Sequence, residues 1–243
     1  MVDQLVLVRH GESAGNEAAA AARVAGAEVL EIPDRDPDVP LTAVGLEQAA
    51  ALGHALGRLL ADGRTTRVWS SPYVRALQTT QLAVAAAGGG LVVRYDERLR
   101  DRELGVLDLL TREGVANRYP VEAQRRQWWG KFYHRPPGGE SWADVALRVR
   151  FFLFEVLATP GVERVVVVAH DAVVMLARYV LEGLDEHAVL QIGATDPVRN
   201  ASVTVLDRYE DVGWQLTRYN DVDHLLHSGA PVTQHGGEPD VAH

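Results

Sequence analysis

Two histidines in this chain directly follow short runs of branched aliphatic residues, a composition typical of strands that are buried on both faces. Residues 5–8 lead into Arg9 and His10, and residues 164–169 lead into His170. A neutral imidazole offers a nucleophilic nitrogen, and a neighbouring guanidinium offers forked donors to an oxyanion. These residue types at strand ends predict chemistry on an anionic group, and a phosphate ester is the substrate class that fits them.

A third strand end supplies another arginine. Residues 67–69 form a short strand pattern, and Ser71-Pro72 then marks a turn into a helix whose first turn carries Arg75. Proline suits the start of a helix, and the N-terminus of a helix favours anions. In open α/β sheets the carboxyl ends of the strands meet at one edge, where ligands bind. We therefore expect Arg75 to join the two histidines at that edge.

Hydrophobic periodicity predicts the other elements that must position these residues. Thr42 and Ser141 have the side chains of helix N-caps and precede amphipathic patterns. Residues 17–40 have no clean period, so we expect a long loop with an Ala-rich helical turn at its start, either a solvated connector or a lid over the site. The expected helices span residues 43–61, 141–157 and 171–181, and the helix that carries Arg75 continues over residues 78–86. A further strand spans residues 91–93, and strands at 203–206 and 214–216 are expected to form a hairpin.

The order of these motifs resembles the histidine phosphatase superfamily, also called phosphoglycerate mutase-like, over residues 5 to about 206. Six blocks in register are far more specific than any single motif. The blocks are Arg9-His10-Gly11-Glu12-Ser13 with Asn16, Leu41-Thr42 with Gly45-Leu46-Glu47-Gln48-Ala49, Ser71-Pro72 with Arg75-Ala76-Leu77-Gln78-Thr79, Leu99-Arg100-Asp101 with Gly105, Pro137-Gly138-Gly139-Glu140-Ser141, and Val167-Val168-Ala169-His170. Residues 99–105 and 139–145 resemble the broad-specificity phosphatase group of that superfamily.

The resemblance implies an α/β fold: a three-layer α/β/α sandwich with a mostly parallel central sheet. Residues 1–227 would form one histidine phosphatase domain, with an excursion at about 106–145 that partly covers the active site. The aromatic cluster at 128–134 lies in this excursion, and we expect it mainly to pack, with Tyr133 and His134 as the members to test for ligand contact. The Gly/Pro/His-rich residues 228–243 are expected to be a disordered tail.

The same resemblance implies a role for each motif residue. His10 would attack phosphorus and form a phosphohistidine, while Arg9, Arg75 and His170 would hold the phosphate oxygens. Asn16 and Ser13 would add phosphate-binding groups. No cofactor and no metal are expected, because arginine and histidine supply the positive charge that phosphoryl transfer needs.

The proton donor stays open between three carboxylates. The register of the family's acidic residue, four before a glycine, falls on Asp101, where relatives in this branch have the longer Glu. Glu103 could substitute for it. Asp171 is the third candidate, because the acid phosphatase branch has His-Asp at the position of His170-Asp171 and uses that aspartate as the acid. We favour Asp101 as the proton donor. The alternative role for Asp171 is structural, as a carboxylate that stabilises a helix N-terminus.

The segments that cofactor-dependent mutases carry after these motifs are missing, which favours a metal-independent phosphomonoester hydrolase acting on a small phosphorylated substrate. The alternatives are a phosphoglycerate mutase and a phosphate-binding regulatory pseudoenzyme. The formal net charge of −9 predicts no nucleic acid and no membrane partner. No apolar run reaches a membrane span of about 18 residues. The lack of cysteine and of a visible signal peptide fits a cytoplasmic protein, and dimers are frequent in the superfamily, so a homodimer is also open.

Overall fold

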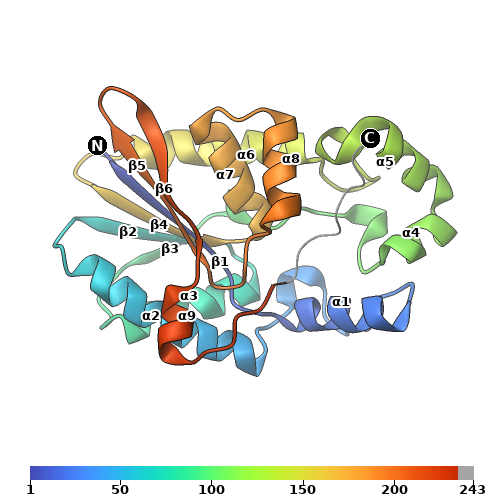
Figure 1. Cartoon of the computed structure of the whole chain (residues 1–243), viewed down its shortest axis with the longest axis horizontal. Coiled ribbons are helices and arrows are strands. Elements are labelled where there is room, and N and C mark those ends of the chain that lie inside the picture. Colours follow the sequence, from blue (N-terminus) through green and yellow to red (C-terminus); the bar gives the residue numbers. More distant parts are fainter. Residues whose placement is uncertain (235–243) are drawn as a thin grey trace.

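A six-stranded sheet forms the centre of the computed structural model, which describes residues 1–234 (Figure 1). The spatial order of the strands is β3-β2-β4-β1-β5-β6. β1 and β4 lie in the middle and are buried on both faces, as their branched aliphatic composition predicts. The strands are β1 (Gln4–Arg9), β2 (Thr66–Ser70), β3 (Val93–Tyr95), β4 (Arg164–Ala169), β5 (Val203–Tyr209) and β6 (Gly213–Asp221).

The sheet is parallel at its centre and antiparallel at one side. β4 pairs in parallel with both β1 and β2, and β2 pairs in parallel with β3. β5 runs antiparallel to β1 and forms the predicted hairpin with β6. The predicted mostly parallel sheet is therefore confirmed, and β1, β2 and β4 all end at the same edge.

Helices cover both faces of the sheet and complete the predicted three layers. α6 and α7 pack on the face that presents Leu5 and Leu7 of β1, and α2 and α3 pack on the face that presents Val6 and Val8 (Figure 1). This alternation follows from the two-residue period of a strand. The helices are α1 (Ala14–Ala25), α2 (Ala43–Leu60), α3 (Val74–Ala86), α4 (Arg112–Arg118), α5 (Pro120–Tyr133), α6 (Trp142–Leu157), α7 (Asp171–Glu182), α8 (Glu186–Thr195) and α9 (Asp223–Ser228).

Local sequence signals set several helix ends. Thr42 accepts a hydrogen bond from Gly45 N at the start of α2, and Ser141 forms a capping box with Asp144 at the start of α6, as predicted. The expectation of only a helical turn after residue 17 is wrong. Ser13 and Asn16 form a second capping box, which starts the twelve-residue helix α1. α8 and α9 were not predicted, and β3 begins two residues later than expected, at Val93.

The excursion at 106–145 contains α4 and α5, which stand beyond the edge where β1, β2 and β4 end (Figure 1). It contacts the segment after α1: Thr111 N donates to Glu28 O at 3.0 Å, and Arg118 pairs with Glu28 at 2.8 Å. α1 and the excursion therefore flank the same edge of the sheet from two sides.

The aromatic cluster is divided between packing and exposure, so the expectation that it mainly packs is only partly met. Phe132 is buried, and His134 is buried with its Nε2 3.3 Å from Glu122 Oε2. Trp128 and Trp129 are 86% and 60% exposed, so they do not belong to the core. α5 is interrupted near this point, because Gly130 has a φ of 69° inside the helix.

The predicted disordered tail begins at residue 228, but its first part makes defined contacts. Gln48 Nε2 donates to Pro231 O and Thr233 Oγ1, both at 2.9 Å, and Asn200 N donates to Thr233 O at 3.1 Å. Residues up to 234 are therefore attached to the domain. The rest of the predicted tail, residues 235–243, lies outside the described residues. Within residues 1–234, no helix combines the length and the apolar composition needed to cross a bilayer.

Candidate active site

The structure brings the three predicted strand ends together. His10 directly follows β1, His170 directly follows β4, and Arg75 lies in the first turn of α3 after β2. The parallel pairing of β4 with both β1 and β2 makes these neighbours, although they are far apart in sequence. The rings of His10 and His170 meet edge to face with their centroids 5.2 Å apart. All three side chains are buried.

His10 is held in the form that a nucleophile requires. Its Nδ1 lies 2.6 Å from the carbonyl oxygen of Gly11. A carbonyl can only accept, so Nδ1 carries the proton and Nε2 carries the lone pair. Burial lowers the pKa of His10 well below 6.5, and the positive charges of Arg75 and Arg9 and the neighbouring His170 lower it further. The imidazole is therefore neutral at neutral pH.

Two glycines make room for the loop that carries His10. A Cβ on Gly11 would lie 2.6 Å from Gly45 O, and a Cβ on Gly45 would lie 2.0 Å from Glu12 O. The N-terminus of α2 therefore rests directly on the backbone after His10. Thr79 Oγ1 accepts from Gly11 N at 3.0 Å, and Gln48 Oε1 accepts from Glu12 N at 2.8 Å, which fixes the loop further.

This contact predicts that Gly45→Ala destabilises the fold by about 2 kcal/mol or more, because two backbone segments would have to separate. The matched control is Gly57→Ala in the same helix, where the new Cβ would be 3.6 Å from its nearest neighbour, Ala87 Cα. We expect that control to be neutral or stabilising by up to about 1 kcal/mol. Urea unfolding of both variants measures the difference. Equal urea midpoints for the two variants would contradict the prediction that this close contact limits residue 45 to glycine.

Arg75 connects two carboxylates at the centre of the site. Its Nη2 donates to Asp101 Oδ2 at 2.9 Å, and its Nη1 donates to the carbonyl oxygen of Asp36 at 2.6 Å. The Asp36 carboxylate also pairs with Nη1 at 3.0 Å. Arg9 is equally buried and donates to Val198 O at 2.5 Å. The two guanidinium groups thus supply fixed positive charge beside the neutral His10.

Asp101 is the carboxylate that contacts the predicted phosphate-binding groups. Its Oδ2 lies 3.2 Å from His170 Nδ1 and 2.9 Å from Arg75 Nη2, and its Oδ1 accepts from Arg102 N at 2.8 Å. Burial alone would raise the pKa of Asp101, but His170, Arg75 and the Arg102 N–H together hold it well below its usual range. Asp101 is therefore ionised in the ligand-free protein.

The two rival carboxylates have other partners. Glu103 Oε1 accepts a hydrogen bond from the hydroxyl of Tyr73 at 2.7 Å. The Tyr73 ring in turn meets the His170 ring, with centroids 5.3 Å apart, so Tyr73 lies between Glu103 and His170. Asp171 is the first residue of α7, where a carboxylate suits the helix N-terminus, and it lines a small cavity of about 30 Å³ with Lys131. Its negative charge also acts on the guanidinium of Arg9. The positions of the three carboxylates favour Asp101.

The two predicted auxiliary groups have structural partners. Ser13 Oγ accepts from Asn16 N at 3.3 Å and so caps α1. Asn16 Oδ1 accepts from Ser13 N at 3.2 Å and from Asn200 Nδ2 at 3.1 Å. Asn200 Nδ2 also lies 3.3 Å from His10 O, which connects this cluster to the loop that carries His10. A direct phosphate contact by Ser13 or Asn16 stays a prediction.

Several residues of the site were not predicted. Ser71 Oγ lies 2.9 Å from His170 Nε2, and its place beside Pro72 in a motif could have indicated it. Arg148 of α6 donates to the carbonyl oxygens of Arg100 at 2.8 Å and of Asp101 at 3.0 Å, and so positions the Asp101 segment. The contact of Asp36 with Arg75 has no sequence signal, and it shows that the segment 17–40 reaches the site instead of serving only as a connector.

Buried histidines predict how stability depends on pH. Burial is the main cause that lowers the pKa of His10, His134, His170 and His224 below 6.5. Around pH 6 the unfolded chain therefore binds protons that the folded chain does not, and the free energy of unfolding falls as the pH falls. Urea midpoints at about pH 7.5 and about pH 5.5 measure this. A higher midpoint at the lower pH would contradict the prediction.

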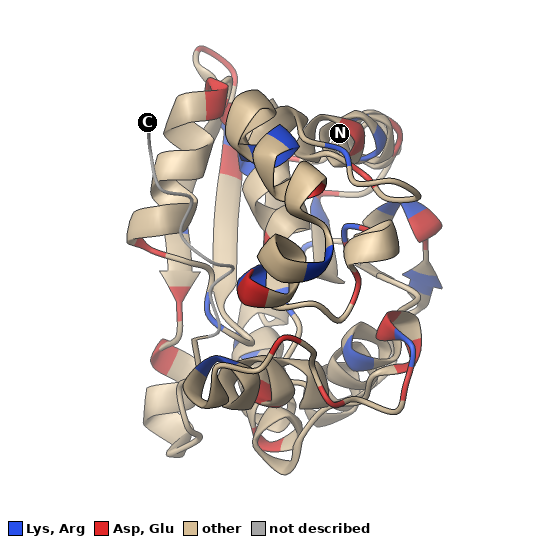
Figure 2. Cartoon of the chain, turned by 90° about the vertical axis from the view of Figure 1, so that its right-hand side faces the viewer, with Lys and Arg blue, Asp and Glu red and all other residues tan. Residues whose placement is uncertain are grey.

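The charge that could hold an anion is local to the site. Figure 2, which faces the side where α1, α4 and α5 stand, shows basic and acidic segments intermingled over that side. No group of three or more His, Cys, Asp or Glu side chains that could hold a metal ion occurs within residues 1–234. Independence from a metal and from a cofactor stays a prediction.

The comparison with known families agrees with this geometry. The family model of the histidine phosphatase superfamily (branch 1) matches residues 5–222. The chain belongs to this superfamily. The protein named probable phosphoglycerate mutase GpmB from Yersinia enterocolitica is 31% identical over 228 residues, which cover 91% of this chain and 94% of that protein. The predicted family is therefore confirmed.

Solved structures of the superfamily share the whole domain. The mycobacterial glucosyl-3-phosphoglycerate phosphatase is 29% identical, with a TM-score of 0.69 over 90% of this chain and 99% of that one. A structure described as an alpha-ribazole-5'-P phosphatase from Escherichia coli has a TM-score of 0.70 at 20% identity, a likeness of fold alone. The predicted α/β sandwich is confirmed, and so is the predicted enzyme class at the level of this superfamily of phosphatases and mutase-like proteins.

Proposed function

We propose that the protein hydrolyses small phosphomonoesters without a metal, through a phosphohistidine on His10. The observation that carries this proposal is the hydrogen bond from His10 Nδ1 to Gly11 O, which leaves the Nε2 lone pair beside Arg9 and Arg75. A nucleophile that is neutral and already oriented can attack phosphorus without first losing a proton. The two guanidinium groups neutralise the phosphate oxygens and spread the charge of the transition state.

In the first step His10 Nε2 forms a bond to phosphorus while the bond from phosphorus to the ester oxygen breaks. Arg9, Arg75 and His170 hold the remaining phosphate oxygens. Burial lowers the pKa of His170, and a bound phosphate dianion raises it again, because a negative charge favours the imidazolium. His170 thus becomes a cation when the substrate that needs it is present.

The leaving oxygen takes a proton from Asp101. In the ligand-free protein Arg75 and His170 hold the pKa of Asp101 low, so the carboxyl is ionised. A bound phosphate dianion takes over these two cations and adds negative charge nearby, and both changes raise the pKa of Asp101. Asp101 then carries the proton as the substrate binds. The carboxyl of Asp101 is therefore protonated in the substrate-bound state, which is the state in which a general acid must donate its proton.

In the second step water attacks the phosphohistidine. The bond from phosphorus to Nε2 breaks, Asp101 accepts the proton from water, and inorganic phosphate leaves. The reaction needs only water besides the ester, so no metal or organic cofactor enters either step. The same residue acts first as acid and then as base, as in other two-step displacements.

Asp36 competes with the substrate for Arg75. Its carboxylate pairs with Arg75 at 3.0 Å in the ligand-free protein, and burial raises its pKa against the opposing effect of Arg75. We predict that Asp36→Asn lowers KM about five-fold, because one negative charge beside the incoming phosphate is removed. The control is Asp38→Asn in the same short turn, which is exposed. An unchanged or higher KM in Asp36→Asn would contradict the competition.

Release of inorganic phosphate from a panel of phosphomonoesters, with EDTA present, tests the proposed function. The panel includes sugar phosphates and phosphoglycerates, because relatives are named for a glucosyl-3-phosphoglycerate phosphatase and a phosphoglycerate mutase. A hydrolase releases phosphate unaided. A mutase interconverts phosphoglycerates only after priming by a bisphosphoglycerate, and a pseudoenzyme binds phosphate but forms no phosphohistidine. Phosphate release that depends on an added metal would overturn the proposal.

The expected partners and location are part of the proposal. We expect a cytoplasmic protein that binds a small phosphorylated substrate and neither nucleic acid nor membrane. A homodimer is supported by an apolar stripe on α6, where Leu147, Phe151 and Phe154 are 57%, 61% and 82% exposed at helical spacing. Analytical ultracentrifugation of the full chain distinguishes the dimer from the monomer.

A further inference from the structure

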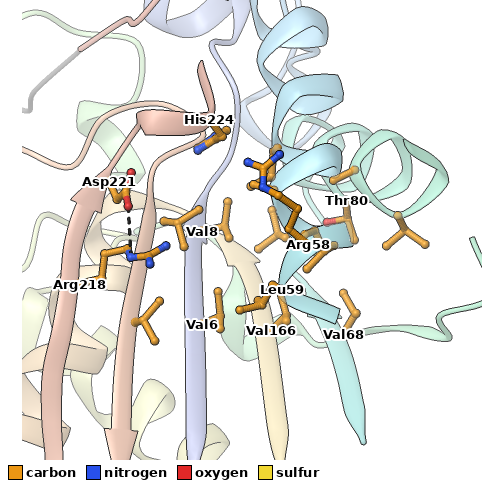
Figure 3. Close-up of a pocket in the computed structure, with 18 of the residues that line it drawn as sticks. Val6, Val8, Arg58, Leu59, Val68, Thr80, Val166, Arg218, Asp221 and His224 are labelled. Carbon is orange, nitrogen blue, oxygen red and sulfur yellow. Dashed lines mark ion pairs between the residues drawn. The ribbon is translucent and has the colours of Figure 1, made fainter. Parts of the chain in front are cut away.

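A cavity of about 160 Å³ lies between the sheet and the layer formed by α2 and α3 (Figure 3). Its floor is made of valines on β1, β2, β4 and β5, among them Val6, Val68 and Val166. Ala83 of α3 and Ala55 of α2 line it from the helices. Valine and alanine have short side chains, so this face leaves a space that longer residues would fill. No residue of the proposed catalytic mechanism lines the cavity.

One buried polar atom at the end of this cavity lacks a partner. His224 of α9 lines the cavity and is 6% exposed, and its Nε2 has no hydrogen-bond partner within the part of the chain that the structure describes. The carbonyl of Ala201 accepts a hydrogen bond from this imidazole. That bond must come from Nδ1, so Nε2 carries the lone pair of a neutral ring. Burial lowers the pKa of His224, which keeps the ring neutral.

Charged residues surround the mouth of the cavity next to this histidine. Arg218 Nε pairs with Asp221 Oδ2 at 3.2 Å, and the positive charge of Arg58 acts on His224 (Figure 3). Arg58 and Arg218 are exposed, whereas the valine floor is buried. The site thus has an apolar body, a buried acceptor without a partner at one end and a polar opening, which is the usual composition of a small-molecule site.

We propose that this cavity binds a small apolar ring or branched chain that carries one hydroxyl group, such as a phenol. The hydroxyl donates to His224 Nε2, and the hydrocarbon part lies against Val6, Val166 and Ala83. An engineered apolar cavity of about 150 Å³ in another protein holds benzene, so a single aromatic ring fits a space of this size. A buried acceptor left without a partner is costly, and the ligand hydroxyl removes that cost.

The first test compares phenol with toluene, which has nearly the same shape but cannot donate a hydrogen bond. Calorimetric titration of the full chain should give one phenol per chain, bound about five-fold more tightly than toluene, the effect of one hydrogen bond. NMR of the same sample should show contacts between the phenol ring and valine methyl groups. Absence of binding at millimolar phenol, or contacts with other methyl groups, would overturn the proposal.

Three variants locate the site. Ala83→Leu fills the cavity and should abolish phenol binding, and the control Ala85→Leu makes the same change at an exposed position of α3 and should leave binding unchanged. His224→Phe should remove the preference for phenol over toluene. If Ala83→Leu binds phenol like the wild type, or if the preference persists in His224→Phe, the proposal fails. The NMR contacts in the wild type decide the matter if a variant does not fold.

Discussion

We expect His10→Ala to lower phosphate release by about 10⁴-fold or more, because removal of a covalent nucleophile leaves only binding and charge stabilisation. His10 has its Nδ1 hydrogen-bonded to Gly11 O and is buried beside Arg75 and His170, so its Nε2 is the proposed attacking atom. Steady-state release of phosphate measures the loss. Rapid quench with radiolabelled ester should also give acid-labile phosphate on the wild type and none on the variant.

The matched control is His54→Ala. His54 is exposed on α2, so this change removes an imidazole from the same protein without touching the site, and full activity is expected. Binding of inorganic phosphate to His10→Ala reports whether the arginines are still in place. Activity of His10→Ala within about ten-fold of the wild type would exclude the phosphohistidine mechanism.

We expect Asp101→Asn to lower kcat by about 10² to 10⁴-fold for alkyl phosphates, the range that a general acid supplies. The loss should be small for p-nitrophenyl phosphate, whose leaving oxygen needs no proton. This dependence on the leaving group separates a proton donor from a residue that only positions Arg75 and His170, because loss of positioning would lower the rate with both esters. Rates measured with the two esters give the ratio directly.

Asp171→Asn and Glu103→Gln are the matched controls, because each removes a rival carboxylate with little change of shape. Asp171 starts α7 and Glu103 is held by Tyr73, so neither variant should alter the ratio of the two esters. If Asp171→Asn shows the leaving-group dependence and Asp101→Asn does not, then the acid is Asp171. The proposed first step would then have the wrong proton donor, whereas the nucleophile would be unaffected.

The sequence predicted those features that depend on short stretches of chain. The aliphatic runs before His10 and His170 identified two buried strands, and Thr42 and Ser141 marked the starts of two helices. Such signals are local, because strand burial and helix capping depend on neighbouring residues. The position of the site followed as well, since the ends of parallel strands must meet at one edge.

Only the tertiary structure decided which polar groups meet. Asp36 pairs with Arg75, and Asp101 contacts both Arg75 and His170, whereas Asp171 lines a small cavity and its charge acts on Arg9. These contacts join segments far apart in the chain, and no local pattern encodes them. The pKa values depend on them too, because burial and neighbouring charge set the pKa of His10 and of Asp101. The sequence by itself therefore determined the family, the fold and the site's place at the sheet edge. Packing across the chain determined that Asp101 contacts Arg75 and His170, and which charges neighbour it.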